Sequence, residues 1–239
     1  MMLLETQGLS KSFSGVKAVV NVDWQVQQGD LWGVVGPNGS GKTTLFNTIS
    51  GYYRHTAGRV IFDGNDVGRL RMRSRARSGL MRTFQHAEVF GSLTVEENLA
   101  VAARASKDRY PELTESLEIL GLASSAHVPA AALPFGKRRL LGVAMAASTK
   151  PAMLVLDEPT SGLNDAEAEE LAVYLRALNG GGLTLAIVDH HMEFLLPLCR
   201  RMLLLRTGEK LWEGTPEEFA RSETVLETYL GYGSQPVGA

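Results

Sequence analysis

The sequence lacks two features that would assign it to a secreted or membrane-spanning class. Its 239 residues include one cysteine, Cys199, which excludes an internal disulfide and is compatible with a reducing cytosol. There is no continuous apolar run of about 18 residues, the length that a membrane-spanning helix needs. Residues Met1 to Leu4 are followed at once by Glu5, which does not fit a signal peptide. We expect a cytoplasmic protein that contacts a membrane only through partners.

An excess of one charge is also missing. The chain has 24 Lys and Arg against 26 Asp and Glu, and its formal net charge of -2 gives no general attraction to nucleic acid. The stretch from Arg69 to Arg82 is locally basic, and we interpret it as a solvated helix face. With 44% hydrophobic and 21% charged residues, the composition is that of a soluble globular protein. We therefore expect no nucleic-acid partner.

Apolar runs separated by turns predict an α/β protein. The expected strands are Leu3 to Leu9, Leu31 to Val35, Val60 to Phe62, Met153 to Leu156, Thr184 to Val188 and Met202 to Leu205. The last three alternate with helical stretches, as in a buried parallel sheet. Between the two groups, Thr94 and Glu97 predict a capping box at the start of a mostly helical segment that ends near Ser148.

A glycine-rich loop follows the apolar run that ends at Val35. Its sequence matches G-x-x-x-x-G-K-[ST], and it lies between a predicted strand and a predicted helix over Thr44 to Ser50. Glycines let backbone N–H groups surround phosphate oxygens, Lys42 can neutralise the β and γ phosphates, and the Thr43 hydroxyl can ligate Mg²⁺. The residues expected to contact nucleotide here are Gly36, Pro37, Asn38, Gly39, Ser40, Gly41, Lys42, Thr43 and Thr44. The other interpretation, a glycine turn with an incidental lysine, does not explain both flanks.

A second run, Met153 to Leu156, ends in the adjacent carboxylates Asp157 and Glu158. Strand ends are where sites form in α/β folds, and neighbouring strand residues point in opposite directions. We expect one carboxylate in the Mg²⁺ shell and the other facing the attacking water. Beside the phosphate loop, this interpretation is preferred to two solvated acids at a strand end.

These motifs resemble those of the ABC ATPases, and the resemblance runs from about Leu3 to Gly231. Asp157 to Thr160 followed by Ser161 to Asn164 looks like the family's Walker B and D-loop, which other P-loop classes lack. The resemblance implies a P-loop NTPase with a RecA-like core, an N-terminal antiparallel β subdomain and an α-helical subdomain at about residues 86–148. All of these would form one ABC ATPase domain over residues 1–239.

Further residues resemble family elements in family order. Gln85 resembles the Q-loop glutamine, His190 the switch histidine, and Phe13 the aromatic that stacks on adenine. By its chemistry, Gln85 offers an amide oxygen to Mg²⁺ or water, and an imidazole at His190 can bond the γ-phosphate and orient water. The resemblance implies that Glu158, His190, Gln85 and Lys42 are catalytic, that Thr43, Gln85 and Asp157 hold Mg²⁺, and that Ser161 lies at the nucleotide. Taken alone, Gln85 would be a surface amide, Phe13 a packing aromatic and His190 a helix cap; His191 is given no role.

The signature motif departs from the family pattern. Where Leu-Ser-Gly-Gly-Gln is common, this chain has Leu133, Pro134, Phe135, Gly136 and Lys137. Proline removes a hydroxyl and a backbone donor, but it fits just before a helix whose N-terminus and Gly136 can present N–H groups to the nucleotide of an opposing subunit. A Leu-Pro-aromatic-Gly motif is similar to that of branched-chain amino-acid importers. Lys137 is unexplained, and a weakened composite site is the alternative that stays open.

The resemblance implies a second ATP-binding subunit, identical or not, and transmembrane permease subunits. Residues Thr83 to Leu99 and Glu227 to Gly231 resemble segments of branched-chain amino-acid and urea importers, and lipopolysaccharide exporters share parts of both. We expect ATP and Mg²⁺ as cofactors and a peripheral location on the inner face of the cell membrane. The alternatives are an exporter of the lipopolysaccharide type and a soluble switch protein that does not act in transport.

Overall fold

The computed structural model describes residues 1–83, 89–104 and 113–230. Among these residues, the strands form a four-stranded sheet in the order β2-β1-β4-β5 and a six-stranded sheet in the order β10-β9-β3-β8-β7-β6. The strands are β1 (Met2–Phe13), β2 (Val16–Gln27), β3 (Leu31–Val35), β4 (Ala57–Phe62), β5 (Asn65–Asp66), β6 (Leu80–Arg82), β7 (Met153–Asp157), β8 (Thr184–Val188), β9 (Arg201–Arg206) and β10 (Glu209–Gly214).

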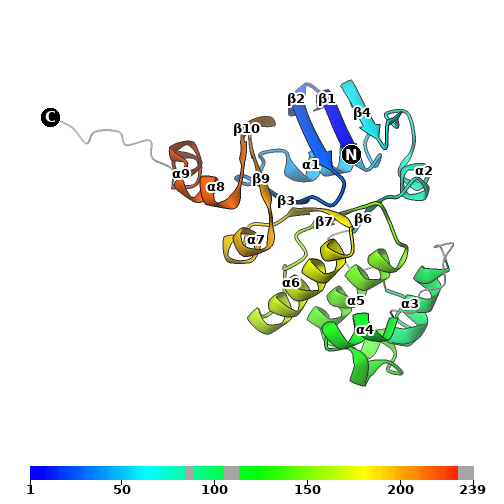
Figure 1. Cartoon of the computed structure of the whole chain (residues 1–239). Coiled ribbons are helices and arrows are strands. Elements are labelled where there is room, and N and C mark those ends of the chain that lie inside the picture. Colours follow the sequence, from blue (N-terminus) through cyan, green and yellow to red (C-terminus); the bar gives the residue numbers. More distant parts are fainter. Residues whose placement is uncertain (84–88, 105–112, 231–239) are drawn as a thin grey trace.

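The described helices flank and extend these sheets (Figure 1). They are α1 (Lys42–Ile49), α2 (Met72–Arg77), α3 (Val95–Ala103), α4 (Leu113–Ile119), α5 (Phe135–Ser148), α6 (Asp165–Gly180), α7 (Met192–Leu198), α8 (Pro216–Arg221) and α9 (Glu223–Leu230), with short 3-10 turns at Ala123–Ser125 and Ala130–Ala132. None of them has the length and apolar character of a membrane span.

The six-stranded sheet is the core of the molecule. Every residue of β3, β7 and β8 is buried, and these strands pair in parallel with one another and with β6 and β9, whereas β10 joins the edge antiparallel. A parallel sheet covered on both faces requires such continuous apolar strands. This confirms the strands and the α/β class expected from the sequence. Helix α1 starts at Lys42, two residues before the predicted helix.

The four-stranded antiparallel sheet lies above this core, and α3, α4 and α5 lie below it (Figure 1). The hairpin of β1 and β2 reaches the core through Trp24, which stacks on Phe46 of α1 at 6.3 Å between ring centroids. At the start of α3, the predicted capping box is confirmed: the Thr94 hydroxyl accepts from the Glu97 amide, and the Glu97 carboxylate accepts from the Thr94 amide. The fold therefore presents one sheet edge to a largely helical region.

The basic stretch from Arg69 to Arg82 differs from its sequence interpretation. It contains only a six-residue helix, α2, and the strand β6, and two of its arginines, Arg75 and Arg82, are buried. A solvated helix face therefore accounts for only part of it. Cys199, which follows α7, is also buried and 6% exposed. Burial raises the pKa of its thiol well above the ordinary value.

Candidate nucleotide-binding site

The phosphate loop joins β3 to α1, and its shape depends on close approaches of the backbone. A Cβ atom on Gly36 would lie 2.2 Å from the Leu205 carbonyl oxygen, and one on Gly41 would lie 2.3 Å from that of Ala18. Both glycines have positive φ angles, 149° and 102°. Gly39 also has a positive φ, yet nothing lies within 4 Å of its Cβ position. The loop is thus held from behind by neighbouring strands and is open in front, as a phosphate cradle requires.

Lys42 lies across the mouth of this loop. Its Nζ donates to the carbonyl oxygens of Gly36 at 2.6 Å and Pro37 at 3.0 Å. Burial lowers the pKa of this ammonium group, and the nearby carboxylates of Glu158 and Asp157 oppose the shift. Its contacts are with neutral carbonyls, so a phosphate is a stronger partner for the same ammonium group.

The two carboxylates at the end of β7 have different surroundings. Asp157 is 2% exposed, and its Oδ2 accepts from Nη2 of Arg82 at 2.6 Å, while Arg82 also donates to the side chain of Asn47 on α1. Its other oxygen, Oδ1, is buried with no hydrogen-bond partner in the described structure. Burial raises the pKa of Asp157, and Arg82 counteracts that shift. One oxygen is thus fixed by an arginine, and the other is available to a cation.

Glu158 is half-buried and has a left-handed backbone, with φ 47°. Its amide donates to the Val188 carbonyl at 2.7 Å, which ties the end of β7 to β8. Arg139 of α5 donates from Nε to the Pro159 carbonyl at 2.9 Å and from Nη2 to that of Glu158. A non-glycine residue in this conformation is uncommon, and such residues cluster at active sites. Glu158 therefore differs from Asp157 in backbone conformation and in burial.

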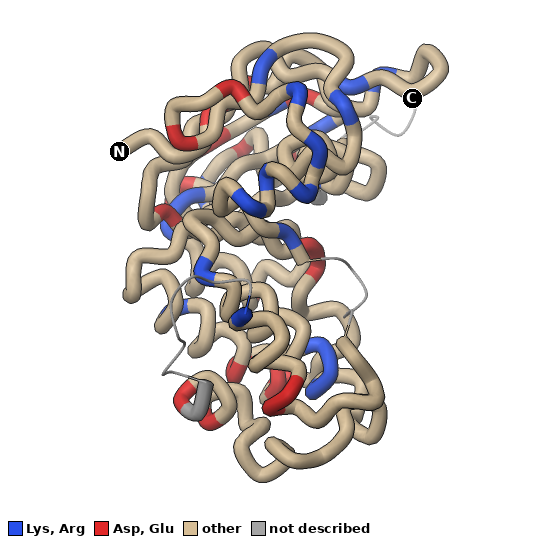
Figure 2. The backbone as a smooth tube through the Cα atoms, turned by 90° about the vertical axis from the view of Figure 1, so that its right-hand side faces the viewer, with Lys and Arg blue, Asp and Glu red and all other residues tan. Residues whose placement is uncertain are grey.

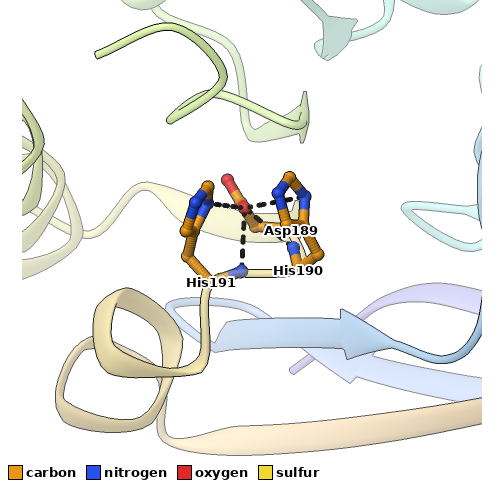
Figure 3. A group of neighbouring side chains, drawn as sticks. All are labelled: Asp189, His190 and His191. Carbon is orange, nitrogen blue, oxygen red and sulfur yellow. Dashed lines mark hydrogen bonds and ion pairs between the residues drawn. The ribbon is translucent and has the colours of Figure 1, made fainter. Parts of the chain in front are cut away.

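Beyond β8, Asp189 lies between His190 and His191 (Figure 3). Its Oδ1 accepts from the His190 amide at 2.8 Å, the His191 amide at 3.1 Å and Nδ1 of His191 at 3.0 Å. Its Oδ2 accepts from the Thr160 amide at 3.1 Å and hydroxyl at 2.7 Å. These three ligand-type side chains lie close enough to hold a metal ion, but both carboxylate oxygens already accept hydrogen bonds. Asp189 therefore acts as an orienting acceptor for the two histidines and for Thr160.

The histidines themselves differ in their contacts. The side chain of His190 is 62% exposed, and its Nδ1 lies 3.7 Å from Oδ1 of Asp189. His191 Nδ1 lies 2.7 Å from the Thr160 hydroxyl and 3.0 Å from Oδ1 of Asp189, so a proton on this ring nitrogen faces both oxygens. The exposed His190 is thus presented outward at the end of β8, whereas His191 bonds to the segment after β7.

The signature residues open α5. Pro134 is the N-cap of this helix, as the sequence predicted, and Phe135 is 54% exposed. Gly136 lies so close to Glu167 that a Cβ there would meet its carboxylate at 2.2 Å. Lys137 donates to Glu170 at 2.6 Å and to the Leu120 carbonyl at 3.1 Å. The lysine that the sequence left unexplained therefore joins α5 to α6 and to the end of α4 within its own subunit.

The remaining predicted residues lie around these segments or outside the described part. Phe13, at the end of β1, is 38% exposed and meets Tyr53 edge-on at 5.0 Å, with Nζ of Lys11 at 4.6 Å from its ring centroid. Ser161 donates its amide to the Glu158 carbonyl at 3.2 Å. Gln85 lies outside the described residues.

The residues present fit a nucleotide and a divalent cation. The cradle is open at Gly39, and the side-chain oxygen of Ser40 inside it is buried with no hydrogen-bond partner among the described residues. The unpartnered Oδ1 of Asp157 and the exposed Thr43 supply oxygen ligands of the kind that Mg²⁺ prefers. A magnesium nucleotide therefore matches the chemistry of the donor set.

Sequence reasoning missed four residues that hold this site together. Arg82 of β6 donates to Asp157 and also to Asn47 of α1, Arg139 reaches the turn after β7, and Asp189 orients the histidines. Each acts through a contact between distant parts of the chain or through a side chain of no distinctive motif. Only Asp189 carried a signal, as an acid directly after a buried strand.

Taken together, the strand–loop–helix cradle and the strand ending in two carboxylates define a P-loop nucleotide-binding protein. The sequence profile of the family ABC transporter matches residues 19–161, and the chain belongs to this family. It is thus an ATP-binding subunit of an ABC transporter and an ATPase, and its fold is the ABC ATPase fold. These findings confirm the family resemblance and the fold class expected from the sequence.

Individual relatives are similar to this chain along nearly its whole length. The chain is 34% identical over 249 residues to the high-affinity branched-chain amino acid transport ATP-binding protein LivG of Salmonella typhimurium, covering 96% of this chain and 98% of the relative. It is 32% identical to the lipopolysaccharide export system ATP-binding protein LptB of Haemophilus influenzae, covering 97% of this chain and 98% of the relative. The crystal structure of MJ1267 in its ADP conformation, an ATP-binding cassette of an ABC transporter, has a TM-score of 0.84 at 28% identity over 97% of this chain and 99% of MJ1267.

Proposed function

We propose that this chain hydrolyses ATP to drive an ABC importer of branched-chain amino acids or similar small polar or amide solutes. The observation that carries the proposal is the similarity to LivG, whose name states branched-chain amino acid transport, over 96% of this chain. The substrate does not contact this subunit in such a machine. The permease therefore determines which solute is transported, and we infer the solute for this chain only from its similarity to LivG.

In the proposed reaction, backbone amides from Gly36 to Thr44 and the ammonium group of Lys42 hold the triphosphate. Phe13 stacks on the adenine, and Ser161 lies near the nucleotide. Thr43, Asp157 and Gln85 would ligate Mg²⁺, which would supply positive charge to the phosphates. Arg82 keeps one oxygen of Asp157 engaged at 2.6 Å, which favours ligation through the other.

Glu158 polarises the attacking water, and His190 bonds the γ-phosphate and orients that water. Lys42 stabilises charge that develops on the transferred group. His190 is suited to this role because its backbone amide donates to Asp189 while its side chain is 62% exposed. A preoriented donor costs little reorganisation when the charge develops.

One chain is proposed to supply only half of each catalytic site. Leu133 to Lys137 would close over the nucleotide of an opposing subunit, which is either a second copy or a homologue. The exposed Phe135 at the start of α5 supports this, since large exposed apolar side chains at such a position favour an interface. The pair would bind permease subunits on the inner face of the cell membrane, and closure would move the helical region.

The test is reconstitution of transport with candidate permease subunits and a candidate substrate-binding protein from the same organism. In proteoliposomes with ATP inside, we expect uptake of labelled leucine or isoleucine that stops in the Glu158→Gln variant. A matched control, Glu217→Gln on the exposed face of α8, should keep wild-type uptake. ATPase activity that couples to no solute uptake in the assembled complex would contradict the importer proposal.

A lipopolysaccharide-type exporter is the second candidate, because the chain is also 32% identical to LptB over 97% of its length. It predicts assembly with an export permease and ATPase activity without amino-acid uptake. A soluble switch protein, the third reading, predicts ATP binding with no turnover even beside the permease. The reconstituted assay separates all three.

A further inference from the structure

Three arginines are buried within the described part of the chain, Arg75, Arg82 and Arg139. The other described Lys and Arg residues are exposed or half-buried, and Figure 2 shows Lys and Arg segments gathered in the upper half of that view. Arg75 and Arg139 donate to backbone carbonyl oxygens, whereas Arg82 donates to two side chains. Arg82 therefore orients groups that would otherwise be free to rotate.

The side chain of Arg82 joins three elements of the fold. Arg82 ends β6, and its Nη2 donates to Oδ2 of Asp157 on β7 at 2.6 Å, while its Nη1 donates to Oδ1 of Asn47 on α1. The side chains of Arg82 and Asp157 are 4% and 2% exposed, so water does not compete for this contact. A guanidinium is planar and rigid. It therefore fixes how far the carboxylate of Asp157 lies from the amide of Asn47.

The two elements that Arg82 bridges also carry the described oxygen ligands proposed for Mg²⁺. Asp157 ends β7, and its Oδ1 has no hydrogen-bond partner in the described structure. Thr43 lies in α1 four positions before Asn47, and residues at that spacing are neighbours on one side of a helix. A shift of α1 relative to β7 would therefore change the separation of the two ligands. Arg82 restrains that shift.

Neutralising a buried carboxylate is a simpler role for Arg82, but it leaves the contact with α1 unexplained. A single cation of any shape beside Asp157 would balance its charge, and a buried ion pair is weak evidence of stabilisation. The second bond, to Asn47, adds nothing to that balance because an amide is neutral. Its effect is geometric, since it ties the position of Asp157 to α1.

We propose that Arg82 is a positioning residue that sets the spacing of the oxygen ligands Thr43 and Asp157 and so makes the site prefer Mg²⁺ to larger cations such as Ca²⁺. The proposal rests on the proposed function for the identity of these two ligands. Mg²⁺ needs near-ideal octahedral geometry with ligands at about 2.0–2.1 Å, whereas Ca²⁺ accepts flexible geometry at about 2.3–2.6 Å. A fixed spacing therefore matters for Mg²⁺ and much less for Ca²⁺.

The test compares Arg82→Lys, which keeps the charge but loses the planar fork, with Asn47→Ala, which keeps the pair with Asp157 but removes the partner on α1. AMP-PNP, an ATP analogue that resists hydrolysis, is titrated by calorimetry in excess MgCl₂, in excess CaCl₂ and in EDTA. The affinity in EDTA reports the phosphate loop alone, and its ratio to the other two reports what each cation adds. Because changes behind metal ligands typically cost about 10- to 100-fold in metal affinity, we expect the Mg²⁺ ratio to fall by at least about tenfold in both variants. The Ca²⁺ ratio and the affinity in EDTA should change by less than about threefold.

Arg75→Lys is the matched control, because Arg75 is also buried and donates to the Thr48 and Ile49 carbonyls at the other end of α1. Its three affinities should keep the wild-type ratios. Circular dichroism checks that each variant is folded; if Arg82→Lys is not, Asn47→Ala decides alone.

Unchanged ratios in the folded variants would overturn the positioning role and leave the proposed function intact. Equal weakening in MgCl₂, CaCl₂ and EDTA would also overturn it, because Arg82 would then support only the fold. A wild type whose affinity for AMP-PNP gains nothing from Mg²⁺ would overturn both this role and the proposed magnesium ligands.

Discussion

The phosphate loop and the signature loop, which we propose both face nucleotide, are built in different ways. The first is a backbone cradle whose glycines press against the Leu205 and Ala18 carbonyls. The second depends on side chains, since Gly136 packs on Glu167 and Lys137 pairs with Glu170 of α6. The cradle is formed within one chain, whereas Pro134 and Phe135 are exposed on the surface. The difference fits our proposal that one subunit binds the nucleotide while turnover needs two.

The strongest way to break this comparison is Glu158→Gln, which removes the carboxylate but preserves volume. We expect ATP affinity to be kept and turnover to fall by about 10² to 10⁴-fold, since glutamine cannot act as a base. The variant should accumulate as an ATP-bound dimer, which size-exclusion chromatography would detect. The dimer should be less abundant when ADP replaces ATP. If the natural pair is unequal, the assay is repeated with the sister subunit. Wild-type turnover in both settings would falsify Glu158 as the catalytic carboxylate.

The next largest effect is expected from a change in the phosphate loop alone. Lys42→Ala removes charge-assisted hydrogen bonds worth about 1.5–3 kcal/mol, so ATP binding should weaken by roughly 10- to 100-fold. Its present partners are loop carbonyls of Gly36 and Pro37, so the fold should survive, which circular dichroism checks. Lys210→Ala, in an exposed hairpin, is the control. An unchanged affinity would remove Lys42 from the site.

A third change cuts the connection between the signature helix and the turn after β7. Arg139 of the signature helix bonds to the carbonyls of Glu158 and Pro159, and Arg139→Met leaves both oxygens without that donor. We expect a loss of about 1–3 kcal/mol in the free energy of unfolding, measured in urea. Arg138→Met, at the neighbouring half-buried position, is the matched control. Equal stability of the two variants would mean that this connection is not structural.

The smallest effect is expected at the signature loop. If the helix N-terminus and Gly136 supply the essential contact, Pro134→Ser should change ATPase activity by no more than about fivefold, because a neutral hydrogen bond is worth about 1 kcal/mol. The activity is measured with the permease and any sister subunit present. A gain of a hundredfold or more would show that the native signature is degenerate and that catalysis belongs to a partner.

Local patterns predicted much of this molecule. The buried strands, the capping box of Thr94 and Glu97 and the loop from Gly36 to Thr44 depend on neighbouring residues, and the structure confirms them as elements. The family and the α/β class followed from the same motifs. The roles given to individual side chains remain predictions.

Contacts between residues far apart in the chain could not be predicted from the sequence. Arg82 and Asp157 are separated by 75 positions, and Lys137 and Glu170 by 33. No periodicity or spacing links such pairs, because the chain must fold before they meet. The basic stretch shows the same limit. Its arginines predicted a solvated helix face, but Arg75 is buried and donates hydrogen bonds to four backbone carbonyl oxygens.

The buried thiol of Cys199 has a practical consequence for observing how two subunits meet. With 6% exposure and a pKa raised by burial, it forms little of the thiolate that attacks maleimides. A cysteine introduced in place of the exposed Phe135 would therefore react selectively in the otherwise natural chain. Spin labels or fluorophores attached there could follow the distance between paired subunits through a cycle of ATP binding and release, without a cysteine-free background being made first.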